Sequence, residues 1–169
     1  MSLWVNCGSC DLPLPKPWIN VDNSTSPHII SDLTLDCREL DSHFAENSVD
    51  RIYAAHFCEH LTPKEAQDWV TMCYRLLKPG GELGIVTPDM REVARMYLEG
   101  DISIDDLNHT YVFSYQQESV HRSCHDIGSL KRMLENSGFT DIVPIDRLTD
   151  ERLAYPADWQ VGAQGNKPS

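Results

Sequence analysis

The sequence predicts one α/β domain built on a mostly parallel β-sheet. In the second half of the chain, apolar and β-branched runs typical of buried strands alternate with segments whose apolar residues recur at helical spacing. This alternation indicates a sheet with helices on its faces. A chain of 169 residues is long enough for one such domain with its own core.

The first half contains three short strand-like runs without a helical pattern between them. They are VNC before Gly8, WINV before Asp22, and HIISDL at residues 28–33. Parallel strands normally need a crossover of a dozen or more residues, and the connection before the third run is shorter. We therefore expect a very short third strand or an irregular connection, at a sheet edge that lacks its usual covering helices.

The second half supplies clearer boundaries. Thr62 as N-cap with Glu65 three residues later forms a capping-box pattern, and Asp89 with Glu92 repeats it. Pro144 favours an edge position for the strand that contains it. The predicted elements are a strand in 48–57, a helix from 63 stopped by Pro79–Gly81, a strand at 82–88, a helix to about 98, a helix in 126–138, and strands at 141–146 and 158–165.

Residues 1–165 are expected to form the domain, and residues 166–169 a frayed tail. Residues 100–125 are polar and aromatic without a clear period, so they are interpreted as an insertion or lid.

The charge balance excludes several partners. The chain has 26 acidic and 14 basic side chains, a formal net charge of -12, and no stripe of Lys or Arg. This argues against nucleic acid and anionic membranes as partners. No apolar stretch approaches the ~20 residues of a membrane span, and a signal-peptide pattern is missing. We expect a cytoplasmic protein.

The six cysteines are scattered along the chain, so free thiols are expected. Cys7 and Cys10 form a C-x-x-C pair, but no second pair at ligand spacing completes a zinc site.

Six segments in chain order resemble the class I S-adenosylmethionine-dependent methyltransferases. The segments are VNCGSC, WINVD, IISDL, SVDRIYAAHFCEHL, RLLKPGGELGIVTPD and SLKRMLENSGF. They are most similar to the small-molecule group, which carries an LNLGCG...GWINVD opening, EHL after the fourth strand and LKPGG before the fifth. The resemblance spans about residues 3–146. It implies a Rossmann-like fold, methyl transfer to an unidentified small molecule, and S-adenosylmethionine as the cofactor, released as S-adenosylhomocysteine.

The resemblance also assigns cofactor contacts. Asp22 would accept hydrogen bonds from both ribose hydroxyls, a role that suits an acceptor-only carboxylate. The other implied contacts are Asn6, Cys7 and Gly8 to the methionine end, Asp32 with Leu33 to the adenine, and His56 with Phe57 at the mouth of the site.

Two departures leave a second function open. Cys10 stands where the family has a second glycine. A glycine at that place lets the backbone of the loop come close to the ligand. The proline-rich residues 12–17 cannot form the usual helix. The alternative is therefore a degenerate domain that binds a nucleoside or a partner without catalysis. A nicotinamide oxidoreductase is disfavoured, because its glycine-rich phosphate cradle is missing.

His56, Glu59 and His60 are the candidate catalytic residues. They also match H-x-x-E-H, the pattern of one class of zinc peptidases. That pattern needs both histidines on one helical face, but here it follows a strand and precedes the helix start. A zinc peptidase is therefore kept only as a minor alternative, and we expect no metal site. In a methyltransferase, His56 or His60 is suited to act as general base. Alternatively, Glu59 and His60 only fix the turn, because methyl transfer needs mainly alignment.

His121 and Arg122 resemble an HR pair that precedes the last helix in this family. With His125, they are interpreted either as contacts to an anionic substrate or as ordinary surface residues.

Overall fold

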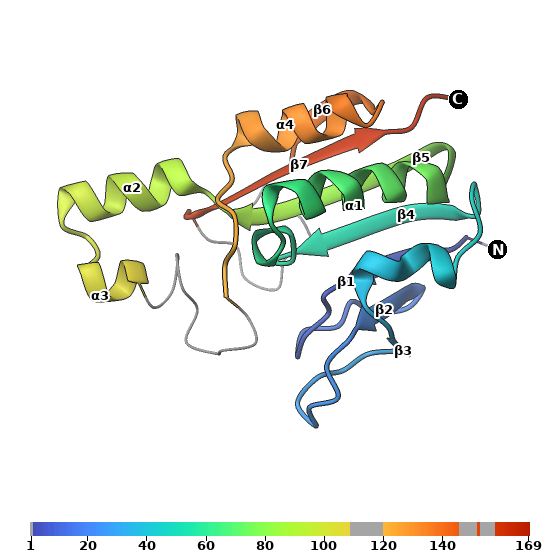
Figure 1. Ribbon diagram of the computed structural model, residues 1–169, viewed down its shortest axis with the longest axis horizontal. Coiled ribbons are helices and arrows are strands. Elements are labelled where there is room, and N and C mark those ends of the chain that lie inside the picture. Colours follow the sequence, from blue (N-terminus) through green and yellow to red (C-terminus); the bar gives the residue numbers. More distant parts are fainter. Residues whose placement is uncertain (1, 109–119, 146–151, 153–157) are drawn as a thin grey trace.

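The protein is described by a computed structural model that covers residues 2–108, 120–145, 152 and 158–169 (Figure 1). Its strands form a seven-stranded sheet in the order β3-β2-β1-β4-β5-β7-β6. The strands are β1 Trp4–Cys7, β2 Trp18–Asp22, β3 Leu33–Thr34, β4 Val49–Ala55, β5 Leu77–Pro88, β6 Thr140–Pro144 and β7 Gln160–Asn166. Strands β1 to β5 run parallel, and β7 is antiparallel to both neighbours. The predicted α/β fold with a mostly parallel sheet is confirmed.

Two of the longer helices, α1 Pro63–Leu76 and α4 Ile127–Asn136, cover one face of this sheet. The remaining helices are α2 Met90–Glu99, the short α3 Ile104–Asp106 and the 3₁₀ helices η1 Cys37–Ser42 and η2 Cys58–His60. In Figure 1, α1 and α4 lie side by side along the sheet, whereas α2 projects from the end of β5. Within the described part of the chain, no helix is long and apolar enough to cross a membrane.

The N-caps predicted at Thr62 and Asp89 both form, but Asp89 accepts from Arg91 N at 3.0 Å, where the predicted capping box would use the N–H of Glu92. Thr62 Oγ1 accepts from Glu65 N at 3.3 Å, and Glu65 Oε2 accepts from Thr62 N at 2.8 Å. Asp126 forms the corresponding box with Ser129 at the start of α4. Helix α1 ends at Leu76, before the predicted stop, because Leu77 turns to an extended conformation and pairs with Val49 as the start of β5.

Replacing Thr62 with alanine is expected to lower the free energy of unfolding by about 1 kcal/mol, because it removes the capping oxygen. Urea denaturation measures this. The control Thr25→Ala, at an exposed loop residue, should change it by less than about 0.5 kcal/mol. Equal stability of the two variants would contradict the role of the cap.

The first half differs in one respect from the prediction. Strand β3 contains only Leu33 and Thr34, so most of the predicted run at 28–33 is not a strand. Asp32 fixes this register, because its N–H donates to Asn20 O at 2.8 Å and its carboxylate accepts from Asn20 N at 2.9 Å. As expected, β1 and β2 are joined by residues 8–17 without a helix.

Each face of the sheet has its own apolar cluster. The larger one combines residues of β1, β2, β4, β5, α1 and α4. The smaller one contains Trp18, Tyr53, Val86 and Ile145, with Trp4 packed against Trp18 at 5.2 Å between ring centroids. None of the described residues of this smaller cluster belongs to a helix.

The end of the chain is more ordered than expected. Strand β7 continues to Asn166, and Lys167 exchanges backbone hydrogen bonds with Gly80 and Gly81, both at 2.8 Å. The predicted frayed tail is therefore wrong for these two residues, since they pair with the start of β5. Strand β6, which contains Pro144, lies at the sheet edge as predicted.

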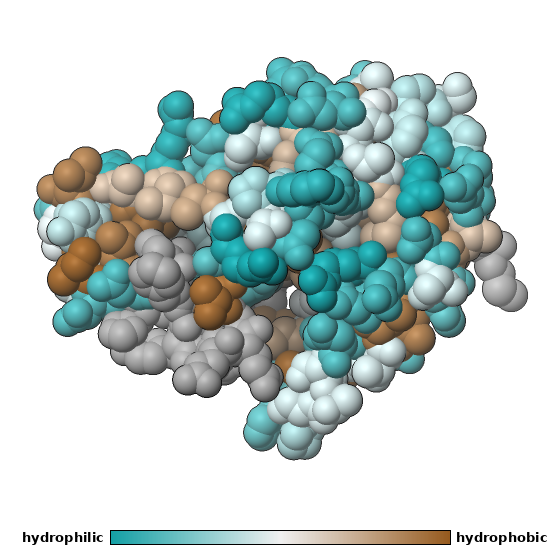
Figure 2. All heavy atoms as spheres, viewed as in Figure 1, coloured by the Kyte–Doolittle hydropathy of each residue, from teal (hydrophilic) through white to brown (hydrophobic). Residues whose placement is uncertain are grey.

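The proposed insertion at 100–125 is described only in part, since residues 109–119 lie outside the described residues. Its first part carries α3, and its last residue, His125, forms a parallel bridge with Asp89. Figure 2 shows hydrophobic surface gathered over α2 and α3, where Leu98 is 82% and Ile104 50% exposed.

Candidate active site

The loop after β1 lies at the carboxyl edge of the sheet, where ligands of such folds bind. Gly8 has a φ of +68°, and its N–H donates to Val21 O at 2.9 Å. A Cβ at this position would lie 3.3 Å from the Cβ of Phe57. The backbone therefore passes the turn after β4 closely, in a conformation that favours glycine.

Asp22 ties this loop to the end of β2. Its Oδ2 accepts from Cys10 N at 3.0 Å, and its Oδ1 accepts from Ser24 N at 2.9 Å. Each carboxylate oxygen has capacity for a further hydrogen bond. Asp22 is thus fixed at the position from which the sequence predicted a ribose contact.

Asn6 and Cys7 lie beneath the loop. Asn6 is buried, and its amide donates to Asn20 Oδ1 at 2.9 Å. A hydrogen bond with Cys37, together with burial, raises the pKa of the Cys7 thiol. The side chains of both residues are therefore engaged within the protein, and their backbones lie between strands β2 and β4, which both pair with β1. All six cysteines are free, as predicted.

The two residues predicted to contact adenine lie before and within β3. Asp32 precedes β3, and its carboxylate also accepts from Lys16 at 2.7 Å, while Leu33 lies inside β3 opposite Val21. The acidic residue beyond the carboxyl end of β3 is Asp36, which caps η1 by accepting from Arg38 N at 2.9 Å. The sequence signal that identifies it is an acid directly before the turn CREL.

His56 is held between two partners after β4. Its Nδ1 lies 3.0 Å from Glu59 Oε1, and its Nε2 lies 2.8 Å from the amide nitrogen of Gln160 on β7. Its φ is +54°, and its ring lies 5.4 Å from that of Trp159. His56 precedes η2, so the H-x-x-E-H pattern does not lie on one helix, as predicted. Gln160 and Trp159 are site residues that the sequence did not reveal.

Glu59 is a buried carboxylate, with 2% of its surface exposed. Burial acts to raise its pKa, but the hydrogen bond with His56 and the charges of His56 and His60 outweigh this, so that the pKa is lowered. Oε2 of Glu59 has no hydrogen-bond partner among the described residues. Leaving a buried polar group unpaired is costly.

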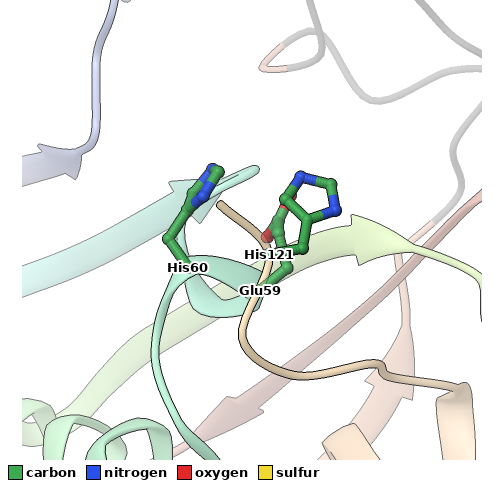
Figure 3. Close-up of side chains that lie close together, drawn as sticks. All are labelled: Glu59, His60 and His121. Carbon is green, nitrogen blue, oxygen red and sulfur yellow. The ribbon is translucent and has the colours of Figure 1, made fainter. Parts of the chain in front are cut away.

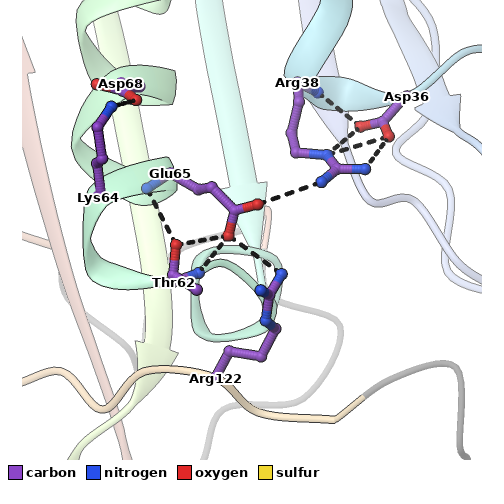
Figure 4. Close-up of polar contacts among 7 residues, drawn as sticks. All are labelled: Asp36, Arg38, Thr62, Lys64, Glu65, Asp68 and Arg122. Atoms are coloured by element: carbon purple, nitrogen blue, oxygen red, sulfur yellow. Dashed lines mark hydrogen bonds and ion pairs between the residues drawn. The ribbon is translucent and has the colours of Figure 1, made fainter.

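Residues 120–125, here called the strap, are bound to η2. The N–H groups of Arg122 and Ser123 donate to Glu59 O at 2.7 and 3.1 Å. The Arg122 guanidinium lies 3.1 Å from Glu65 Oε2, within the polar network of Figure 4. The strap thereby brings the His121 ring to 5.0 Å from the His60 ring.

The three predicted strap residues therefore have different surroundings. His121 is beside His60, Arg122 is paired with Glu65, and His125 is buried with its Nε2 2.9 Å from Ser123 Oγ. Burial lowers the pKa of His125. A shallow depression, partly open to solvent, lies between the strap and α2. Its walls are formed by Glu59, Pro88, Met90, Val93, His121, Ser123, Cys124 and His125.

Comparisons with known proteins agree with this geometry. A family described as a methyltransferase domain matches residues 20–85. No curated protein sequence matched the chain. A methyltransferase from Archaeoglobus fulgidus, described as S-adenosylmethionine-dependent, has a similar structure with a TM-score of 0.66 at 16% identity, over 98% of this chain and 86% of its own.

Two further solved structures are similar over 99% of this chain. One is a Haloferax volcanii protein described as a methyltransferase, in complex with the Trm112 activator, with a TM-score of 0.64, 14% identity and 83% of its own length covered. The other is Haemonchus contortus phosphoethanolamine N-methyltransferase 2 with phosphomonomethylethanolamine and S-adenosylhomocysteine, with a TM-score of 0.61, 15% identity and 49% of its own length covered. The chain has the fold of the class I S-adenosylmethionine-dependent methyltransferases and, over residues 20–85, the sequence pattern of their methyltransferase domain.

Proposed function

We propose that the protein binds S-adenosylmethionine at the loop after β1 and transfers its methyl group to a small molecule. The observation that carries this proposal is Asp22, which is the last residue of β2 and holds the loop through Cys10 N at 3.0 Å. A loop that turns at Gly8 with φ +68° presents backbone rather than side chains to a ligand. The fold places this loop at the carboxyl edge of the sheet.

Each part of the cofactor has candidate contacts in this proposal. Backbone groups of Asn6, Cys7 and Gly8 bind the methionine end, and Asp22 accepts the ribose hydroxyls. Asp36 takes the adenine role in place of Asp32, because it follows β3. His56 and Phe57, which follow β4, complete the mouth of the site.

The reaction requires little beyond alignment. A lone pair of the acceptor attacks the methyl carbon, the carbon–sulfur bond breaks with its electrons going to sulfur, and S-adenosylhomocysteine leaves. The acceptor's proton passes to a base or to solvent. The contacts of His56 with Glu59 and Gln160 make it a positioning group at the site edge. A general-base role for His56 or His60 stays a prediction.

Ligand binding tests the proposal directly. At ~100 times its dissociation constant, S-adenosylhomocysteine should stabilise the fold by about 2.7 kcal/mol. For a domain of this size, that is a rise of roughly 5 to 10 °C in melting temperature. No shift in melting temperature at millimolar ligand would overturn the proposal. It would favour a non-catalytic domain, for example one that binds a protein partner.

Replacing Cys10 with glycine is expected to leave S-adenosylhomocysteine affinity unchanged or to increase it. Cys10 has a φ of +47°, a left-handed conformation that costs a side-chain-bearing residue roughly 1–2 kcal/mol. The change also removes a side chain from a loop whose backbone must come close to the ligand. Isothermal titration calorimetry measures the effect, and weaker binding would show that the thiol contacts the ligand.

A further inference from the structure

Three side chains of the kinds that bind transition metals converge at the edge of the site. Glu59 and His60 belong to η2 and His121 to the strap, and Figure 3 shows the three side chains lying close together. Their candidate ligand atoms lie within 4.8 Å of one another. Ligands about 2.1 Å from one tetrahedral ion lie about 3.4 Å apart, so shifts of less than about 1 Å in each side chain bring all three onto one ion.

Glu59 has one carboxylate oxygen that is available to bind a cation. One of its oxygens, Oε1, lies 3.0 Å from His56 Nδ1. The other, Oε2, has no hydrogen-bond partner among the described residues, although the side chain is only 2% exposed. A buried oxygen of a charged group without a donor destabilises the fold. A metal ion bound by this oxygen removes that penalty, while His56 orients the carboxylate as outer partners of metal ligands do.

The backbone holds the three residues together in the absence of any ion. The two hydrogen bonds from Arg122 N and Ser123 N to Glu59 O fix the strap against η2. The Val120 carbonyl lies 3.4 Å from His60 Nδ1 and directs that ring toward the strap. The His60 and His121 rings meet at 5.0 Å and 69°. The arrangement is therefore built from two segments and does not depend on one mobile side chain.

The cluster also borders open space. Glu59 and His121 both line the depression beside α2. An ion held by three protein ligands keeps at least one coordination position for water or a substrate atom. The depression has room for about one water-sized group, which can reach that position.

We propose that Glu59, His60 and His121 bind a divalent transition-metal ion such as Zn²⁺. Two imidazoles and one carboxylate suit zinc, cobalt and ferrous iron, whereas Mg²⁺ and Ca²⁺ favour sites made of oxygen ligands. The sequence argument against a metal concerned His56 and His60, and His121 replaces His56 in this set. One part rests on the proposed function: the open position takes a hydroxyl oxygen or amine nitrogen of the methyl acceptor and orients it toward the methyl group.

Titration of metal-free protein with Co²⁺, followed by visible absorption, tests the site without any cofactor. One Co²⁺ per chain should bind and be displaced by Zn²⁺, whereas millimolar Mg²⁺ should not compete. Glu59→Gln and His121→Ala should each weaken binding at least about 100-fold, because losing an outer partner alone costs 10–100-fold. His28→Ala, at an exposed histidine outside the cluster, should bind as the wild type does.

Lack of saturable Co²⁺ binding, or equal affinity in the His121→Ala and His28→Ala proteins, overturns the inference. His121→Ala keeps this test informative if Glu59→Gln impairs folding, because His121 is partly exposed. The two proposals fail separately. S-adenosylhomocysteine binding without Co²⁺ binding overturns only the metal site, and Co²⁺ binding without S-adenosylhomocysteine binding overturns only the methyltransferase function.

Discussion

Replacing Asp22 with alanine is expected to weaken S-adenosylhomocysteine binding at least about tenfold. A hydrogen bond to a charged group contributes roughly 1.5–3 kcal/mol, and about 1.4 kcal/mol is one decade in affinity. The structure adds a second reason. Asp22 accepts from Cys10 N and Ser24 N, so its loss also releases the loop that carries Gly8. Calorimetric titration of both proteins measures the difference.

Two control variants separate these effects. Asp11→Ala removes an exposed carboxylate from the same loop without touching the bond to Cys10 N, and its affinity should stay within about twofold of the wild type. Asp22→Asn keeps one acceptor oxygen and should give an intermediate loss. If Asp22→Ala binds as Asp11→Ala does, Asp22 is a turn residue and the ribose contact is incorrect.

The combination with Cys10→Gly distinguishes an active site from a relic. If the site is active, the wild-type protein binds S-adenosylhomocysteine and the Asp22→Ala protein binds it more weakly. If the site is a relic, the wild-type protein does not bind the ligand but the Cys10→Gly protein does. In that case only the side chain at the strained position of Cys10 keeps the ligand away from the loop. In that case the fold is retained while the proposed function is lost.

Elements decided by neighbouring residues could be predicted from the sequence. The capping box at Thr62 acts over three residues, and it formed as expected. Strand β3 could not be placed, because its two residues carry no alternation. Two hydrogen bonds between Asp32 and Asn20 of β2 decide the position of β3. One joins the two backbones, and the other joins the backbone of Asn20 to the carboxylate of Asp32.

That single error explains the change of the adenine candidate. When β3 is placed at 28–33, Asp32 lies at its end, whereas in the structure Asp32 precedes β3 and Asp36 follows it. The contact of Gln160 with His56 was not predictable for a different reason. It spans 104 residues and depends on β7 inserting antiparallel between β5 and β6. The meeting of His60 with His121 likewise depends on the strap's hydrogen bonds to Glu59.

Trp69 connects the core to the cofactor loop. It lies on α1, is 2% exposed, and packs against Phe57 with ring centroids 5.2 Å apart. Phe57 in turn lies next to Gly8, where an added Cβ would be 3.3 Å away. The indole N–H of Trp69 has no hydrogen-bond partner among the described residues. Its contribution is therefore packing, and it supports the turn that faces the loop.

Replacing Trp69 with alanine is expected to lower the free energy of unfolding by about 3–5 kcal/mol, because the large buried side chain leaves a cavity. At roughly 2–4 °C per kcal/mol, the melting temperature should fall by about 6–20 °C. Trp69→Phe is the matched variant: it keeps an aromatic ring against Phe57 and removes the unpaired N–H, so the cost should stay below about 1.5 kcal/mol. Urea denaturation measures both changes. S-adenosylhomocysteine affinity should fall in the alanine variant and stay unchanged in the phenylalanine variant, because only the alanine variant removes the ring that supports Phe57. Equal unfolding free energies for the two variants would show that the indole, rather than an aromatic ring against Phe57, is what this position requires.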